Sequence, residues 1–240
     1  MRITVLGSGT SQGIPVIGCT CDTCTSDDTR DNRLRSSVLV EKDGFYVVID
    51  AGPDFRQQML INKVPRLDAI LITHEHNDHI SGLDDIRPFN FMQGGNMPLF
   101  AQKRVVNDIQ KKFGYIFEKN PYPGAPRLVC HEVEQNKKYR LFPEIDVQTI
   151  GVMHGDLPIL GYRIDNFAYI TDASYLDTTA MGLLKNLDVL ILNALQFHKH
   201  HAHFTFDEAV ETALGIGAKN TYFTHLSHTL GKHEKLRLLS

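Results

Sequence analysis

A dense group of potential metal ligands directly after an apolar segment constrains this chain more than any other feature. Residues 67–73 form a nearly continuous apolar run, which predicts a strand that is buried on both faces. Four potential ligands follow within six residues, namely His74, His76, Asp78 and His79. Imidazole and carboxylate groups suit zinc, manganese or iron, and a loop at a strand end is a rigid platform for them. The sequence therefore predicts a metal site at this strand end, and this loop offers enough ligands to begin two sites.

The rest of the pattern predicts many short strands with a few helices between them. Apolar runs bounded by turn signals predict strands at residues 3–6, 37–40, 45–49, 128–133, 145–152, 160–164, 167–170, 189–192 and 221–223. Helices are predicted at 54–63, 83–91, 102–113 and 181–186, and from 206 onward behind a capping box of Thr205 and Glu208. This order favours stacked sheets with helices outside, in an α/β or α+β layered arrangement. No repeat or linker interrupts the chain, which predicts one domain over residues 1–240.

Composition and charge argue against several classes of protein. Lysine and arginine total 25 against 28 aspartate and glutamate residues, which gives a formal net charge of −3. That balance lacks the basic excess of a non-specific nucleic-acid binder and argues against nucleic acid as a partner. No apolar run approaches the roughly 20 residues of a membrane span, and no signal-peptide pattern precedes the first predicted strand. We therefore expect a cytoplasmic protein without a membrane partner.

The cysteines form a second group of potential ligands. Three of the four, Cys19, Cys21 and Cys24, lie within six residues. Three neighbouring thiols cannot all pair with one another, and in a reducing compartment this spacing favours a metal over disulfides. A closed structural zinc site needs four ligands. Candidates for the fourth are His228 and Cys130, although the simpler interpretation of Cys130, in its apolar run, is a buried free thiol. A redox-active cysteine triad is a further alternative.

Residues 74–79 resemble the H-x-H-x-D-H signature of the metallo-β-lactamase superfamily. The resemblance implies an α+β chain folded as a four-layer αβ/βα sandwich, with a two-metal site at one edge of the sheets. It implies three further ligands, His154, Asp172 and His225, each of which follows a predicted strand. The ligand sets that it implies are His74, His76 and His154 for one ion, Asp78, His79 and His225 for the other, and Asp172 as the bridge.

Three further features are similar to the phosphodiesterase branch of that superfamily. They are the segment 7–15 with its cysteine motif, the segment 79–87, and the H-x-T element of His203 and Thr205 with residues 225–228 after it. The branch includes the tRNA 3′-processing ribonucleases, and the chain most resembles the 5-phosphoribosyl 1,2-cyclic phosphate phosphodiesterases of bacterial phosphonate breakdown. The resemblance also implies that a structural zinc is held by Cys19, Cys21, Cys24 and His228.

The resemblance implies a metal-dependent phosphodiesterase that hydrolyses a small cyclic or nucleotide-like phosphodiester. Two divalent ions, zinc or manganese, would share a hydroxide that attacks phosphorus in line, and Asp78 and Asp172 would hold these ions. His203 would donate to the phosphate or protonate the leaving oxygen. Thr205 would bind the phosphate, although it is also the natural N-cap of the helix that follows. Asp50, after another predicted strand, would orient a ligating histidine.

Three alternatives stay open. A tRNA 3′-processing endonuclease shares the H-x-T element, but the chain lacks the basic insertion that bacterial members typically carry. An ester, thioester or lactone hydrolase of the same fold gains no support from that element, and the complete ligand set disfavours a non-enzymatic metal sensor. The expected cofactors are two divalent ions, zinc or manganese, and one structural zinc. The expected partner is a small phosphodiester, and association into a homodimer stays open.

Overall fold

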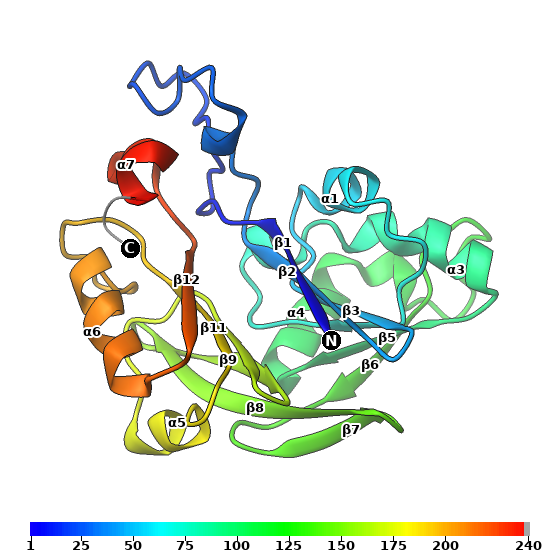
Figure 1. The fold of residues 1–240 in the computed structure, drawn as a ribbon. Helices are drawn as coiled ribbons and strands as arrows, with labels where there is room; N and C mark the ends of the chain where they lie inside the picture. Colours follow the sequence, from blue (N-terminus) through cyan, green and yellow to red (C-terminus); the bar gives the residue numbers. More distant parts are fainter. Residues whose placement is uncertain (238–240) are drawn as a thin grey trace. The chain divides into compact units, whose positions relative to one another are not determined.

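The computed structural model describes residues 1–237, which form two compact units (Figure 1). The first unit combines Met1–Leu6 with Ser37–Thr149, and the second combines Gly7–Ser36 with the chain from Ile150 onward. Strand β8 (Ile145–His154) begins in the first unit and ends in the second. Each unit contains its own sheet strands, its own helices and its own apolar core.

The first unit is built on a mixed sheet with the strand order β1-β2-β3-β4-β5-β6. β2 and β3 form an antiparallel hairpin, whereas β3, β4, β5 and β6 run parallel. The hairpin turns at Asp43 and Gly44, whose φ angles of 50° and 84° match the tight turn that this pair predicts. The strands are β1 (Arg2–Gly7), β2 (Ser37–Lys42), β3 (Phe45–Ile49), β4 (Ala69–Leu71), β5 (Met97–Ala101), β6 (Leu128–Glu132) and β7 (Lys138–Phe142), of which β7 pairs with the start of β8.

The helices of the first unit contribute to a core that also contains the sheet residues Ile70 and Leu99. The helices are α1 (Phe55–Ile61), α2 (Asn77–Ile80), α3 (Arg87–Gln93) and α4 (Lys103–Lys112), with short 3-10 turns at Leu83–Ile86 and Gly114–Ile116. Helix α4 is strongly amphipathic, because Val105, Val106 and Ile109 are buried in this core while its lysines and arginine are not. The apolar face anchors α4, and the charged face is available for polar contacts.

The second sheet has the strand order β12-β11-β10-β9-β8-β7. β9 and β10 are antiparallel, and β10, β11 and β12 are parallel. The core of the second unit combines strand residues such as Ile170 and Leu192 with Ala209 and Ile216 of helix α6. The remaining elements are β9 (Leu157–Ile164), β10 (Phe167–Ile170), β11 (Val189–Asn193), β12 (Asn220–Thr224), α5 (Thr178–Leu183), α6 (Phe206–Ile216), α7 (His233–Arg237) and 3-10 turns at Thr29–Asp31 and His228–Leu230.

Most predicted elements are confirmed, and the mixed sheets with helices confirm the α+β class. The capping box is present: Thr205 Oγ1 accepts from Glu208 N, and Glu208 Oε2 accepts from Thr205 N. Strands β5 and β7 and helix α7 were not predicted, since Pro98 and the charged segments around β7 and α7 hide their patterns. Helix α2 was also not predicted, so Asp78 and His79 lie in a short helix and not in a loop. Among the described residues, no helix combines the length and apolarity that a bilayer crossing requires. A single domain over residues 1–240 stays a prediction.

Candidate metal centres

The metal loop, residues 74–79, brings its four predicted ligands together within the first unit. His74 Nε2 lies 2.9 Å from His76 Nδ1, and His79 Nε2 lies 3.1 Å from Asp78 Oδ2. The rings of His74 and His79 are 4.2 Å apart between centroids. His74 and His79 are buried, at 0% and 1% exposure, so these imidazoles are fixed by packing. Ring nitrogens at such short spacing are typical of a site that shares a cation.

Asp50 organises this loop from the end of β3. Its Oδ1 accepts from Thr73 N at 2.8 Å, and its Oδ2 accepts from Thr73 Oγ1 at 2.9 Å and from His79 Nδ1 at 2.7 Å. Because the Thr73 hydroxyl donates to Asp50, the same oxygen accepts from His74 Nδ1 at 3.0 Å. The carboxylate thereby fixes the tautomers of His74 and His79 and directs both Nε2 lone pairs toward a ligand. Burial raises the pKa of the Asp50 carboxyl, and the bonds from His79 and Thr73 oppose that shift.

Three of the predicted ligand histidines have their Nδ1 atoms in hydrogen bonds, which leaves Nε2 available to bind a metal. Ligating histidines almost always donate the second ring N–H to a carboxylate, hydroxyl or carbonyl oxygen. His79 does so to Asp50 and His74 to Thr73 in the first unit, and His154 Nδ1 lies 2.7 Å from the carbonyl oxygen of Ala202 in the second. The donor set therefore fits divalent ions such as zinc or manganese. The sequence pointed to Asp50, but the contributions of Thr73 and Ala202 were not foreseen, since both residues are inconspicuous in the pattern.

The metal loop also lies against the backbone that follows β3. A Cβ atom added to Gly52 would lie 1.9 Å from the carbonyl oxygen of Asp78, so only glycine fits there. Ala51 N donates to the His79 carbonyl at 2.8 Å, and Gly82 N donates to the Ala51 carbonyl at 2.9 Å. These contacts hold the main chain of the predicted ligands Asp78 and His79 in a fixed position beside the end of the strand.

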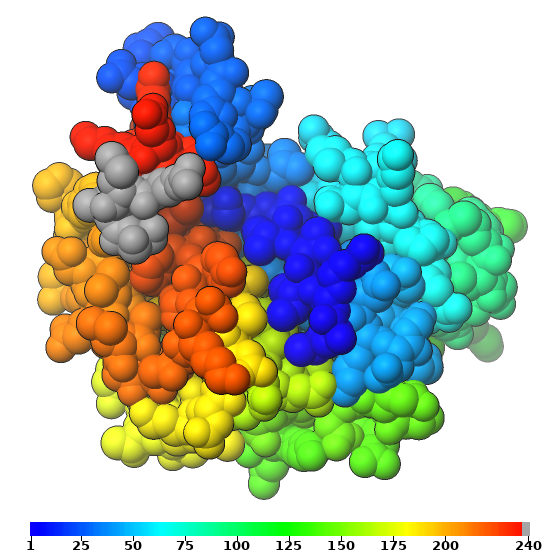
Figure 2. All heavy atoms as spheres, in the orientation of Figure 1, coloured from blue at the N-terminus to red at the C-terminus, as the bar shows by residue number. Residues whose placement is uncertain are grey.

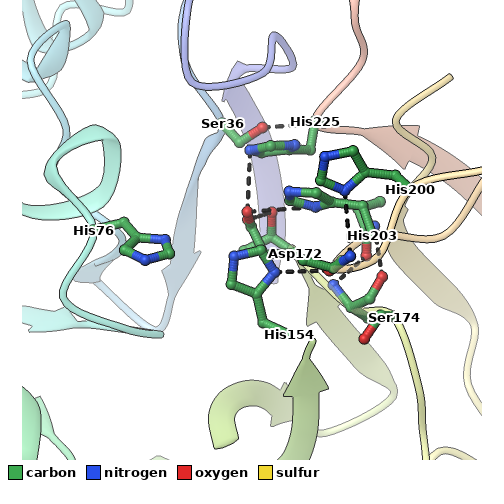
Figure 3. Close-up of polar contacts among 12 residues, drawn as sticks. Ser36, His76, His154, Asp172, Ser174, His200, His203 and His225 are labelled. Carbon is green, nitrogen blue, oxygen red and sulfur yellow. Dashed lines mark hydrogen bonds and ion pairs between the residues drawn. The ribbon is translucent and has the colours of Figure 1, made fainter. Parts of the chain in front are cut away.

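The second unit contains a separate group of predicted residues around Asp172 (Figure 3). Asp172 Oδ1 lies 3.2 Å from His225 Nε2 and 3.7 Å from His203 Nδ1. His154, Asp172 and His203 each offer a potential ligand atom within 4.8 Å of the others. The structure thus brings the predicted ligands of this unit together, and it adds His203, which the sequence placed outside the ligand sets.

Three of the predicted residues lie at strand ends in the left-handed backbone region. The φ angles are 65° for Asp50 after β3, 56° for Asp172 after β10 and 56° for His225 after β12. Aspartate and histidine tolerate this region better than most residues, but it remains sparsely populated. Such conformations cluster at functional sites, where the surrounding structure compensates for them. For His225, part of that support is a hydrogen bond of 3.0 Å from its main-chain N–H to Ser36 Oγ.

His203 and Thr205, the predicted H-x-T pair, have different surroundings. Burial lowers the pKa of His203 to about 3, so its ring is neutral at physiological pH in this environment. Its ring packs against those of His154, at 4.6 Å between centroids, and His225, at 4.9 Å. The Thr205 hydroxyl is occupied as the N-cap of α6. Contact of either side chain with a phosphate stays a prediction.

The cysteine motif gathers around His228 within the second unit. His228 Nδ1 lies 3.4 Å from Cys19 Sγ and 3.3 Å from Cys21 Sγ, and the ligand atoms of these residues and Cys24 all lie within 4.8 Å of one another. The bond to His228 lowers the pKa of Cys21 to about 6, whereas burial raises the pKa of Cys24 to about 11. In Figure 2 the red segment with α7 lies beside the blue segment that carries the cysteines.

Cys130, the alternative fourth ligand, lies instead in β6 and packs against the core of the first unit. Cys130 is a partly buried free cysteine, and burial raises the pKa of its thiol to about 11. Three thiols and an imidazole at these distances fit the donor set of a closed zinc site. The geometry therefore favours His228 as the fourth member, and occupation by zinc stays a prediction.

Comparison with known proteins places the chain in a family. The sequence profile described as Beta-lactamase superfamily domain matches residues 46–226. The crystal structure of a diphosphatase from the PhnP family is 41% identical with a TM-score of 0.92, and the match covers 99% of this chain and 91% of that one. The chain therefore belongs to the β-lactamase superfamily and, within it, to the PhnP family. The predicted metallo-β-lactamase fold is confirmed, and members of this superfamily are metal-dependent hydrolases.

Other relatives differ in length or are more distant. The octanoyltransferase of Porphyromonas gingivalis is 40% identical over 237 residues, which are 98% of this chain and 48% of that protein. The chain spans about half the length of the curated relatives it matches. The Zn(2+)-bound PqqB of Methylobacterium extorquens is 18% identical with a TM-score of 0.80, covering 100% of this chain and 95% of that one, which shows a shared fold.

The close approach at Gly52 generates a prediction. Gly52→Ala should lower the free energy of unfolding by about 1–3 kcal/mol, because the new methyl group must displace the Asp78 carbonyl. Urea denaturation measures this change. Gly95→Ala is the matched control, since a Cβ atom there meets nothing within 4 Å. Equal stability of the two variants would show that the metal loop is not held against this backbone.

Proposed function

We propose that the chain is a binuclear metal-dependent phosphodiesterase that hydrolyses a small cyclic or nucleotide-like phosphodiester. The observation that carries the proposal is the anchoring of predicted ligand histidines through Nδ1, to Asp50 in the first unit and to the Ala202 carbonyl in the second. This arrangement prepares Nε2 atoms for divalent ions. Membership of the family of a diphosphatase supports hydrolytic chemistry at phosphorus.

The proposed ligands are the seven residues that the sequence predicted. They are His74, His76, Asp78, His79, His154, Asp172 and His225. When bound, a pair of divalent ions, zinc or manganese, makes water nucleophilic near neutral pH and stabilises charge on the attacking and leaving oxygens. Asp50 holds His79 in the tautomer that this role needs, and Thr73 does the same for His74.

The second unit also contributes the proposed groups for the substrate. A cavity of about 370 Å³ is lined in part by Gly155, Ser174, His200 and His203, which is room for a small ligand. The neutral ring of His203 would donate a hydrogen bond on the leaving side of the phosphate, and it would donate a proton once the negative charge of a bound phosphate raises the pKa of the ring. Thr205 begins α6, and a helix N-terminus favours a nearby phosphate even while the hydroxyl serves as the cap.

The cysteine site has a structural role in this proposal. Cys19, Cys21, Cys24 and His228 would hold one zinc ion, which joins the segment Gly7–Ser36 to the C-terminal part of the same unit. We further propose that the protein acts in the cytoplasm on a small molecule rather than on nucleic acid, in keeping with its net charge of −3.

A second candidate function follows from the relative in Porphyromonas gingivalis. That protein is named an octanoyltransferase and shares 40% identity with this chain, which favours including an acyl thioester or ester among the substrates tested. The match covers only 48% of that protein, so its name describes a protein that also contains a second half outside the match. Hydrolysis of a phosphodiester remains the leading proposal, because the match to the diphosphatase covers 91% of the length of that protein.

One experiment separates these functions. The protein, purified after expression in zinc- and manganese-supplemented medium, is incubated with bis-p-nitrophenyl phosphate, a cyclic ribose phosphate, a precursor tRNA, a lactone and an octanoyl thioester. We expect turnover of the first two and more than two metal ions per chain by elemental analysis. Turnover confined to the thioester or the lactone, or one metal ion or fewer, would overturn the proposal.

The two kinds of metal site should respond differently to mutation. Cys21→Ala should reduce soluble yield and thermal stability, because a structural zinc contributes folding free energy, while the folded fraction keeps its turnover. Asp172→Ala should abolish turnover with little change in thermal stability. Circular dichroism and the diesterase assay measure both properties. A Cys21→Ala variant that is fully stable but inactive would contradict the structural role.

The role of His203 can be tested by varying the leaving group. General acid catalysis contributes about 10²–10⁴-fold and matters most for poor leaving groups. His203→Ala should therefore reduce turnover of a cyclic ribose phosphate far more than that of bis-p-nitrophenyl phosphate, with unchanged metal content. Equal losses on both substrates would indicate binding of the phosphate instead. Loss of metal would make His203 a ligand, as its position near His154 and Asp172 also allows.

A further inference from the structure

Glu75 and Asn77 alternate with the proposed ligands in the metal loop, and both residues form polar contacts with helix α4. Arg104 near the start of α4 forms an ion pair with Glu75 Oε1. At the other end of the helix, Lys112 Nζ donates to the main-chain carbonyl of Glu75 at 2.9 Å and to Asn77 Oδ1 at 3.2 Å. Glu75 and Asn77 are the two positions that the signature motif leaves unspecified between its ligands.

The geometry of α4 explains how one helix reaches both positions. Arg104 and Lys112 are eight residues apart, a little over two helical turns, and both project from the charged face. The opposite face is locked in the core of the first unit by Val105, Val106 and Ile109. A second contact orients the lysine, since Asp108 Oδ2 lies 2.8 Å from Lys112 Nζ, one turn away.

The Glu75 side chain is partly buried, with 19% of its surface exposed. Glu75 Oε2 is inaccessible to solvent and has no hydrogen-bond partner among the described residues. A carboxylate with one oxygen shielded from water is stabilised by a neighbouring positive charge, and Arg104 supplies it. With its carboxylate committed to Arg104, Glu75 is held away from competing as a ligand with the histidines on either side, His74 and His76.

We infer that Arg104 and Lys112 are positioning residues for the metal loop. They fix the main chain at Glu75 and the side chain at Asn77, so that His74, His76 and Asp78 are arranged for the ions before any ion binds. The inference rests on the proposed metal site and adds to it a source of preorganisation that lies on a different helix. Partners of this kind typically change metal affinity by about 10–100-fold.

The test compares Lys112→Met with Lys111→Met. Methionine keeps the length and apolar stem of lysine and removes the ammonium, and Lys111 is an exposed neighbour on the same helix. Metal affinity is measured by competition with a chromophoric chelator, using zinc and then manganese. We expect Lys112→Met to weaken binding about 10–100-fold while Lys111→Met matches the wild type. Equal affinity of the two variants would overturn the inference.

A second measurement uses the metal-free protein. The His79 amide donates to the His76 carbonyl at 3.0 Å, and the Ser81 amide donates to the Asn77 carbonyl at 3.0 Å. Without Lys112 these two amides should exchange with deuterium faster, while the urea midpoint of the whole protein stays unchanged. Unchanged exchange, or a fall in the urea midpoint that accounts for the loss of affinity, would overturn a positioning role.

Arg104→Lys and Arg104→Ala complete the design. The lysine variant retains the charge beside Glu75, so it should restore much of the metal affinity that the alanine variant loses. Failure of lysine to do better than alanine would contradict the charge compensation at Glu75. A wild-type protein that binds no metal at all would instead remove the proposed function, and this outcome is visible before any variant is measured.

Discussion

A buried aspartate at the end of one strand is the interaction on which the first unit's site depends. Asp50 has no solvent exposure, lies in the left-handed backbone region, and accepts hydrogen bonds from Thr73 and His79. A carboxylate in such a place is costly unless it is fully paired. The pairing fixes the protonated nitrogen of His79 and, through the Thr73 hydroxyl, that of His74. The same hydrogen bonds therefore stabilise the buried charge of Asp50 and orient the two histidines that we propose as ligands.

The two units use different groups to fix the tautomers of their histidines. In the first unit a side-chain carboxylate fixes the histidine tautomers, whereas in the second the main-chain carbonyl of Ala202 does so for His154. In both units the proposed ligands follow strand ends. Parallel neighbours such as β10, β11 and β12 bring distant parts of the sequence to one edge of a sheet. The left-handed conformations of Asp172 and His225 then turn these side chains out of their strands at that edge.

Sequence patterns were sufficient for some parts of this structure and not for others. The ligand motif, its buried strand and the capping box of α6 are local, so their residues and spacing were enough. Strand β5 was missed because Pro98 suggests a break, and yet Pro98 lies in a strand that pairs on both sides. The contact of Gly52 with Asp78, and those of α4 with Glu75 and Asn77, join residues 26 or more positions apart. The periodicity of apolar residues reflects local structure, so it does not predict contacts between such distant residues.

The clustering of Cys21 with His228 has a consequence for the order in which the protein is made. These residues are separated by 207 positions, and the whole of the segment Ser37–Thr149 is synthesised between them. At roughly 5–20 residues per second, the cysteines wait about 10–40 s before their histidine partner is translated. During that interval the first unit's segment can fold as it emerges, but the second unit cannot close. Three neighbouring thiols are therefore without their histidine partner on every nascent chain throughout that interval.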